Sequence, residues 1–322
     1  MASLLSVENL QVQFQTKKGI NTAVDGVSFS VEKGRILGIV GESGCGKSVT
    51  SMSILQLLGS NARISGGSIK LDGKELIGLP EKEMCRIRGN DIAMIFQDPM
   101  TALNPTLTIG TQLMEPIMLH QNCGKKEAWT RAVDVLKRVG IAAPEKRMKE
   151  YPHQLSGGMR QRVMIAMAVS CEPRLLIADE PTTALDVTIQ AQILELMCEL
   201  REKMGTAIML ITHDMGVVAE TADDVLVLYA GKAVEYGSIE DIFERPKHPY
   251  TQGLLNSIPR LDEDVELLNT IEGTVPAPDA MPVGCRFAPR CPYGKDRCMK
   301  EKPGVYHAGN SLVSCFRYEG EK

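Results

Sequence analysis

Several short stretches of the chain alternate between apolar and polar residues, the pattern of strands that bury one face. Residues 7–14 and 23–31 alternate in this way. Residues 64–72 carry a Gly-Gly pair and end at an Asp-Gly step, which predicts a turn-linked β segment. Residues 225–229 and 233–236, joined through a glycine, predict a hairpin.

Other stretches are apolar almost throughout, as strands buried on both faces of a parallel sheet are. They cover residues 35–40, 91–97, 174–180 and 206–212. Apolar residues at helical spacing predict helices, which cover residues 48–58, 128–139, 163–169 and 187–204. Alternating strands and helices indicate an α/β fold.

Composition narrows the class of protein. The chain has 322 residues, 43% of them hydrophobic and 24% charged, which is ordinary for a globular protein of more than one domain. No apolar run is long enough for a transmembrane helix, and the N-terminus lacks the features of a signal peptide. A net charge of −4 gives no support for nucleic-acid binding. Any membrane association is therefore expected to come through protein partners.

The strongest motif is residues 41–48, Gly-Glu-Ser-Gly-Cys-Gly-Lys-Ser, which fit the phosphate-loop pattern G-x-x-x-x-G-K-[ST]. A predicted strand precedes the motif and a predicted helix follows it. Glycines let backbone N–H groups converge on an anion, and the helix N-terminus adds partial positive charge. We expect Lys47 to reach the β- and γ-phosphates and Ser48 to bind Mg²⁺. Cys45 takes one of the x positions of this pattern, where a thiol could make nucleotide binding sensitive to alkylation.

Polar residues end three predicted buried strands, at the edge of an α/β sheet where ligands bind. Asp179 and Glu180 end one strand; Asp179 suits a Mg²⁺ site, and Glu180 suits orienting or deprotonating water. Gln97 ends a second strand, and His213 follows a third.

Two further features have both a functional and a structural interpretation. Residues 155–162 read Leu-Ser-Gly-Gly-Met-Arg-Gln-Arg and form either an anion site at a helix N-terminus or a capped helix start. Phe14 ends a predicted strand, where it either stacks on a purine or packs in the core.

The nine cysteines are unevenly distributed, and four of them crowd the end of the chain at positions 285, 291, 298 and 315. In a chain without an export signal, such a group indicates metal more than disulfides. Four thiolates without histidine suit zinc or an iron–sulfur cluster. Short C-x2-C pairs are absent, which counts against zinc. The alternative is four free or disulfide-bonded cysteines.

Taken together, the motifs resemble the nucleotide-binding subunit of an ABC transporter. The family's motifs occur in the family's order: the phosphate loop (41–48), a glutamine loop (Gln97), a signature octet (155–162), a Walker B strand (175–180), a D-loop (184–186) and a switch histidine (His213). The resemblance covers residues 4–244. One departure is methionine at the fifth place of the signature, where glutamine is commoner. The serine and glycines that approach phosphate are intact.

The resemblance implies a P-loop ABC ATPase core, with a RecA-like sheet, an antiparallel β subdomain and a helical subdomain at about 100–170. It implies catalytic roles for Lys47, Gln97, Glu180 and His213, and a Mg²⁺ site at Ser48, Gln97 and Asp179. Two such domains would meet head to tail, with each signature acting on its partner's ATP. The implied contacts with ATP and its Mg²⁺ are Phe14, Gly41, Glu42, Ser43, Gly44, Cys45, Gly46, Lys47, Ser48, Val49, Gln97, Ser156, Gly157, Gly158, Asp179 and Asp186.

The region beyond residue 244 reads Arg-Pro-Lys-His-Pro-Tyr at 245–250, Gly-Cys-Arg-Phe at 284–287 and Arg-Cys-Pro at 290–292. In these blocks it resembles the tails of ATPases that serve dipeptide and oligopeptide importers. The resemblance implies domains at 1–244 and 245–322, and a [4Fe–4S] cluster with zinc as the alternative, held by Cys285, Cys291, Cys298 and Cys315. It also implies a homologous ATPase partner in a heterodimer, two permease subunits, indirectly a peptide-binding protein, and a place at the cytoplasmic face of the membrane. A nickel importer of the same subfamily and a redox-sensing ATP-binding regulator remain alternatives. ABC proteins of DNA repair or translation are disfavoured, because the chain has one cassette and no heptad run.

Overall fold

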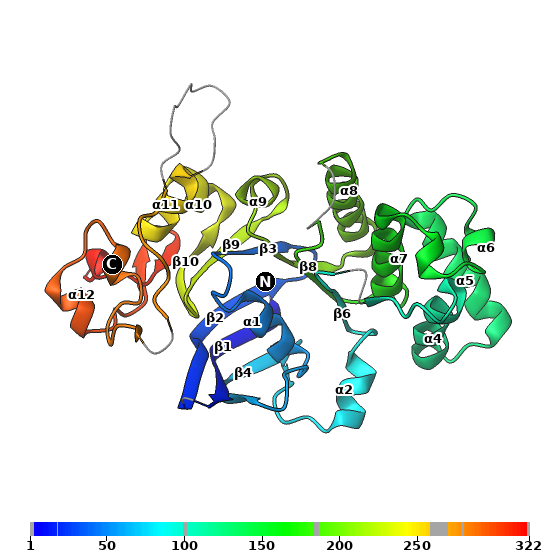
Figure 1. The fold of residues 1–322 in the computed structure, drawn as a ribbon, viewed down its shortest axis with the longest axis horizontal. Helices are drawn as coiled ribbons and strands as arrows, with labels where there is room; N and C mark the ends of the chain where they lie inside the picture. The colour runs from blue at the N-terminus through cyan, green and yellow to red at the C-terminus, as the bar shows by residue number, and fades with distance from the viewer. Residues whose placement is uncertain are drawn as a thin grey trace. The chain divides into compact units, whose positions relative to one another are not determined.

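The computed structural model describes residues 3–17, 19–98, 102–182, 187–257, 270–277 and 280–320. The chain forms two compact units (Figure 1). The helical unit comprises residues 31–35 and 78–211, and the β-rich unit comprises residues 2–30, 36–77 and 212–322.

The β-rich unit contains a four-stranded sheet in the order β2-β1-β4-β5. Its strands are β1 (Ser3–Thr16), β2 (Gly19–Glu32), β4 (Ala62–Leu71) and β5 (Lys74–Glu75). β1 and β4 are antiparallel, and the alternating pattern of β1 buries Leu10 and Val12 completely. The turn-linked segment predicted at 64–72 is this β4–β5 hairpin.

The same unit holds the strands that support the phosphate loop, in the order β11-β12-β10-β9-β3. They are β3 (Ile36–Val40), β9 (Asp224–Tyr229), β10 (Lys232–Ser238), β11 (Tyr306–Ala308) and β12 (Ser311–Val313). β3 runs parallel to β9, and its five residues are all buried. β12 pairs with β10, so the C-terminal region extends the sheet of the core.

Short helices complete the β-rich unit. They are α1 (Lys47–Ile54), α9 (Met215–Thr221), α10 (Ile239–Glu244), α11 (Pro249–Asn256), α12 (Asp296–Lys300) and the 3₁₀ helices Ala288–Arg290 and Phe316–Tyr318. Three buried rings, Tyr229 of β9, Tyr250 of α11 and Phe287, pack edge to face with centroids 4.7–5.4 Å apart. This cluster joins the tail to the sheet, because aromatic pairs add specific packing to the burial of apolar area.

The helical unit is built on three parallel strands, β6 (Ile92–Ile95), β7 (Leu175–Asp179) and β8 (Ala207–Ile211), with β7 in the middle. All residues of β7 and β8 are buried, which explains their uninterrupted apolar sequence. The helices are α2 (Glu81–Ile87), α4 (Ile109–Gln121), α5 (Lys125–Arg138), α6 (Pro144–Arg147), the 3₁₀ helix Pro152–Gln154, α7 (Gly157–Val169) and α8 (Val187–Met204).

Several predicted element boundaries differ from those of the structure, and two of them bear on the site. The helix predicted to end at 58 ends at Ile54, because Gln56 adopts a left-handed φ of 50° and the N–H of Leu57 bonds the carbonyl of Met52 at 2.8 Å. This is a Schellman closure with glutamine at the position that glycine usually takes. The strand predicted to end at Gln97 ends at Ile95, so Gln97 lies in the following loop.

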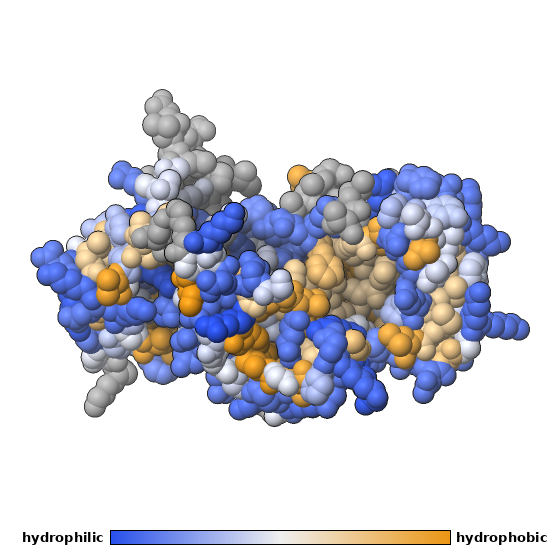
Figure 2. All heavy atoms as spheres, turned by 60° about the horizontal axis from the view of Figure 1, so that its bottom comes forward, coloured by the Kyte–Doolittle hydropathy of each residue, from blue (hydrophilic) through white to orange (hydrophobic). Residues whose placement is uncertain are grey.

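Figure 2 shows one face, on which apolar residues gather in patches between hydrophilic ones. Within the residues that the structure describes, we find no helix with both the length and the apolar character that a membrane crossing requires.

Candidate nucleotide-binding site

The phosphate loop connects β3 to α1 in the β-rich unit, as the sequence predicts. Gly41 has a φ of 148°, and a Cβ placed on it would lie 2.1 Å from the carbonyl oxygen of Leu228. Only glycine therefore fits at the first position of the loop. The loop is also held from the turn between β9 and β10, since the N–H of Gly231 donates to the carbonyl of Cys45 at 2.8 Å.

Lys47 lies across the loop that precedes it. Its ammonium donates to the carbonyls of Gly41 and Glu42, at 2.7 and 3.2 Å, and the residue is 6% exposed. Ser48 is exposed on the first turn of α1, and Ser43 and Gly44 are exposed on the loop. The loop therefore presents a lysine, a hydroxyl and backbone amides together, the groups that bind phosphate and its Mg²⁺.

The structure corrects the expectation for Cys45. The residue is 2% exposed, and burial raises the pKa of its thiol above the usual value. Alkylation requires an accessible thiolate. Cys45 is therefore a poor target for an alkylating reagent.

The Walker B carboxylates end β7 in the helical unit. Asp179 is the last residue of the strand and is 4% exposed. Glu180 follows with a left-handed φ of 48°, and its N–H donates to the carbonyl of Ile211 at 2.8 Å. A non-glycine residue in this region carries strain, which is found most often at functional sites.

Two residues that the sequence predicts separately for the site, Gln97 and Glu180, are in contact. The side-chain amide of Gln97 donates to the carboxylate of Glu180 over 2.8 Å, although 83 residues separate them. The loop after β6 and the end of β7 meet because the two strands are parallel neighbours. The contact orients the carboxylate that the sequence predicts to act on water.

The signature octet forms the start of α7. Ser156 is the N-cap, and its hydroxyl accepts from the N–H of Met159 at 3.3 Å. Gln161 is buried, and its amide donates to the carbonyl of Pro181, directly after the Walker B glutamate. A Cβ on Gly158 would lie 3.3 Å from a methyl group of Ile189 on α8. Ser156 and Gly157 are exposed.

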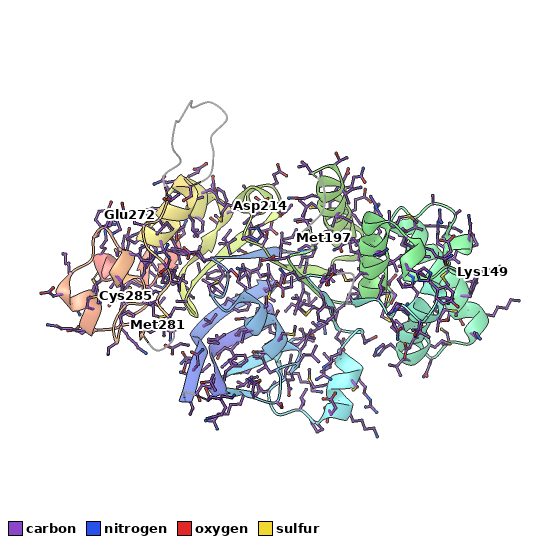
Figure 3. The ribbon with its side chains drawn as sticks, viewed as in Figure 1. Lys149, Met197, Asp214, Glu272, Met281 and Cys285 are labelled. Atoms are coloured by element: carbon purple, nitrogen blue, oxygen red, sulfur yellow. The ribbon has the colours of Figure 1, made fainter. Side chains whose placement is uncertain are left out.

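The remaining predicted residues lie on other elements. His213 is exposed in the β-rich unit, before Asp214, which caps α9 by accepting from the N–H of Gly216 at 2.9 Å (Figure 3). Phe14 is half-buried on β1 opposite Ala62. Val49 is half-buried on α1. Asp186 and the rest of the D-loop lie outside the described residues.

Two residues of the tail contact the phosphate loop, and sequence reasoning missed both. The guanidinium of Arg290 donates to the two carboxylate oxygens of Glu42, each at 3.0 Å. The hydroxyl of Tyr250 accepts from the N–H of Glu42 at 2.9 Å. The partners are 248 and 208 residues apart in the chain, so no local pattern could have predicted these contacts.

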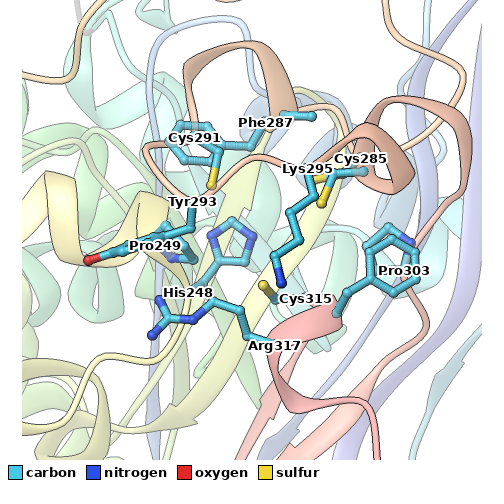
Figure 4. A pocket seen from close by; sticks show the side chains of 13 residues that line it. His248, Pro249, Cys285, Phe287, Cys291, Tyr293, Lys295, Pro303, Cys315 and Arg317 are labelled. Carbon is cyan, nitrogen blue, oxygen red and sulfur yellow. The ribbon is translucent and has the colours of Figure 1, made fainter.

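The four tail cysteines line one cavity of about 80 Å³. Figure 4 shows the sulfur atoms of Cys285, Cys291 and Cys315 around it, with Lys295 reaching across. Burial raises the pKa of Cys285 to about 11 and also raises the pKa of Cys291 and Cys315. All four thiols are free of disulfides. Within the described part of the chain, no three His, Cys, Asp or Glu side chains form a group that could hold a metal ion.

Structural comparison defines the class of protein. The fold is similar to the ATP-binding cassette MJ0796 in a dimeric post-hydrolysis state with ADP and Pi, with a TM-score of 0.66 and 27% identity over 73% of this chain and 98% of that one. It is also similar to cbiO1 from Clostridium perfringens, part of the ABC transporter complex cbiONQ, with a TM-score of 0.65 and 28% identity over 76% of this chain and 92% of that one. The fold is that of an ABC ATPase cassette.

Sequence comparison covers the whole chain. The ABC transporter family matches residues 24–183, and the family of oligopeptide/dipeptide transporter C-terminal regions matches residues 234–298. The oligopeptide transport ATP-binding protein AppD of Bacillus subtilis is 56% identical, over 100% of this chain and 98% of its own length. OppD of Escherichia coli, with the same description, is 52% identical over 98% and 93%. The dipeptide transport ATP-binding protein DppD of B. subtilis is 54% identical over 98% and 95%.

The chain therefore belongs to the ABC transporter family, among its ATP-binding proteins. The resemblance inferred from the sequence motifs and the ABC cassette fold are both confirmed.

Proposed function

We propose that this chain is the ATP-hydrolysing subunit of an importer that powers the uptake of dipeptides or oligopeptides. The observation that carries the proposal is that two family models match different parts of the chain. Residues 24–183 match the ABC transporter family, and residues 234–298 match the family described as the C-terminal region of oligopeptide/dipeptide transporters. In this proposal the chain has a nucleotide-binding domain at residues 1–244 and an importer-type C-terminal region at residues 245–322.

The ATP site uses the residues that the motifs predict. Lys47 and the loop amides bind the β- and γ-phosphates, and Phe14 stacks on the purine. Ser48, Gln97 and Asp179 serve Mg²⁺, some of them through water. Glu180 polarises the attacking water, and its contact with Gln97 over 2.8 Å supports this role, because the amide fixes the carboxylate. His213 contacts the γ-phosphate. Catalysis consists mainly of placement and charge stabilisation.

A second ATPase subunit completes the site in this proposal. Ser156 and Gly158 of the signature act on ATP bound by the partner, and Asp186 of the D-loop lies at the same interface. The exposure of Ser156 and Gly157 at the N-terminus of α7 supports this arrangement, since a helix N-terminus favours an anion. The partner is a homologous chain in a heterodimer. Two permease subunits anchor the pair at the cytoplasmic face of the membrane, and a peptide-binding protein delivers substrate to them.

The tail holds a [4Fe–4S] cluster in this proposal, bound by Cys285, Cys291, Cys298 and Cys315. The four free thiols around one cavity support it. Four thiolates around one cavity suit either a four-iron cluster or a zinc ion, and metal content distinguishes the two. When bound, the cluster would cross-link the tail.

Metal content tests the cluster. Protein purified without oxygen should contain about four irons and four sulfides per chain and absorb broadly near ~400 nm. Cys291→Ser should lose most of the iron, whereas Cys198→Ser, on α8, should keep it. Protein that contains one zinc and no iron would indicate a zinc module in place of the cluster. Protein that contains neither metal would refute the metal site.

Substrate uptake tests the function. The transporter is assembled in vesicles with its permease subunits and binding protein, and accumulation of labelled di- and oligopeptides is compared with that of Ni²⁺. We expect ATP-dependent accumulation of peptide, which Lys47→Met abolishes. Accumulation of Ni²⁺ without peptide would identify a nickel importer. ATP binding without uptake or hydrolysis would favour a redox-sensing regulator.

A further inference from the structure

The phosphate loop carries an acidic side chain that the tail neutralises. Glu42 is the second residue of the loop, and its carboxylate pairs with Arg290 through two contacts of 3.0 Å from one guanidinium nitrogen. The Arg290 side chain is 6% exposed and that of Glu42 is 29% exposed. The pair is largely shielded from water, so the attraction between the two charges is stronger than at an exposed surface.

The guanidinium of Arg290 is held by several partners besides Glu42. Its other donors bond the backbone carbonyls of Glu272, at 2.9 Å, and Ile271, at 3.2 Å. The guanidinium also contacts the hydroxyl of Tyr229 at 3.4 Å and lies 5.8 Å from the centre of that ring. A guanidinium held by this many partners presents its charge to Glu42 in one orientation.

The backbone of the same loop residue is held as well. The hydroxyl of Tyr250 accepts the N–H of Glu42 at 2.9 Å, and Tyr250 is completely buried against Tyr229 and Phe287. The tail therefore binds both the side chain and the backbone of the second loop residue.

We propose that Arg290 and Tyr250 are positioning residues for ATP binding, which act through Glu42. A carboxylate in a loop that binds a triphosphate repels its ligand unless a cation balances it. Arg290 supplies that charge, and Tyr250 fixes the path of the backbone where the loop begins. This inference rests on the proposed ATP site, and it assigns to the tail a role in nucleotide affinity that is independent of any metal.

The test is a double-mutant cycle on the assembled transporter, in which KM for Mg·ATP and kcat are measured separately. Arg290→Gln leaves the charge of Glu42 unbalanced and should raise KM on the order of tenfold, the size of one largely solvent-screened charge near a binding site. kcat should change little. Glu42→Gln added to Arg290→Gln removes the repulsion and should restore KM.

The chain supplies a matched control. Arg297 also lies in the tail next to a cysteine, and its guanidinium pairs with Glu301 and Glu319 on the surface. Arg297→Gln should leave KM and kcat unchanged. Tyr250→Phe, which removes the acceptor for the Glu42 N–H and keeps the ring, should raise KM.

The results separate this inference from its alternatives. An unchanged KM in Arg290→Gln would overturn it, and so would a raised KM that Glu42→Gln does not restore, because a packing role for Arg290 is not relieved at Glu42. Glu42→Gln alone keeps the inference testable if Arg290→Gln does not fold. It leaves the charge of Arg290 unbalanced beside the bound phosphates and should lower KM, and an unchanged or higher KM would contradict the repulsion. Failure of the proposed function would differ, since the unmodified transporter would then not hydrolyse ATP.

Discussion

Asp25 on β2 is held by three cations close to the phosphate loop. Its carboxylate lies 3.0 Å from Arg286, 3.2 Å from Lys232 and 3.3 Å from Lys302. Its N–H bonds the carbonyl of Gly231, whose own N–H bonds Cys45 of the loop. Partial burial alone would raise the pKa of Asp25, but Lys232, Arg286 and Lys302 outweigh it and hold the pKa below its ordinary value of 3.8.

Replacing Asp25 should therefore destabilise the protein in a pH-dependent way. A folded pKa below the unfolded value means that the ion pairs stabilise the fold fully above about pH 4, and that this stability is lost as the pH falls through the folded value. Asp25→Asn should lower the free energy of unfolding at pH 7 by about 1–3 kcal/mol, because the cations lose their partner. The difference from wild type should shrink below about pH 4.

Urea unfolding at several pH values measures this difference. Asp134→Asn is the control, since Asp134 is exposed on α5 and pairs with Lys137 at 3.8 Å. It should change stability little. A difference between Asp25→Asn and wild type that stays constant down to pH 3 would show that the ion pairs do not account for the effect.

At the scale of elements, the N-terminus of α7 depends on one hydroxyl. Ser156 accepts from the N–H of Met159, and the next residues are two glycines, which form helices poorly. Ser156→Ala should lower the free energy of unfolding by about 1 kcal/mol, whereas Ser156→Asn, which keeps an acceptor at the cap, should cost less. Equal losses in both variants, measured by urea unfolding, would mean that the serine does not stabilise the helix as a cap.

Elements with a strong local pattern were predicted well. The helix expected at 187–204 is α8, Val187–Met204, because its apolar spacing continues to its end. The buried strands β3, β7 and β8 were found from their uninterrupted apolar sequence. α1 is shorter than predicted because Gln56, whose side chain bonds the carbonyl of Leu76, takes the left-handed conformation that ends it.

Contacts between distant segments could not be predicted in the same way. The sequence motifs identified Gln97 and Glu180 separately, but only the pairing of β6 with β7 brings them into contact. Arg290 and Tyr250 belong to no nucleotide-binding motif, and they reach Glu42 because β12 joins the tail to the sheet that supports the loop. The sequence did not show that Cys45 is buried, because its burial comes from strands that pack around the loop from other parts of the chain.

At the scale of the whole molecule, the fold places binding and hydrolysis residues on different units. The phosphate loop and His213 belong to the β-rich unit, and the Walker B strand, Gln97 and the signature belong to the helical unit. In an ABC transporter, ATP closes a pair of such subunits and hydrolysis reopens it, which is the population shift that we propose drives uptake.

The most direct test of this account is the ATP turnover of Glu180→Gln in the assembled transporter, measured together with ATP binding. Loss of the residue that acts on water should lower turnover about a hundredfold or more and leave ATP bound. Glu195→Gln, at an exposed position of α8, is the control and should turn over ATP normally. Turnover of Glu180→Gln equal to that of wild type would contradict the assignment of Glu180 and the mechanism built on it.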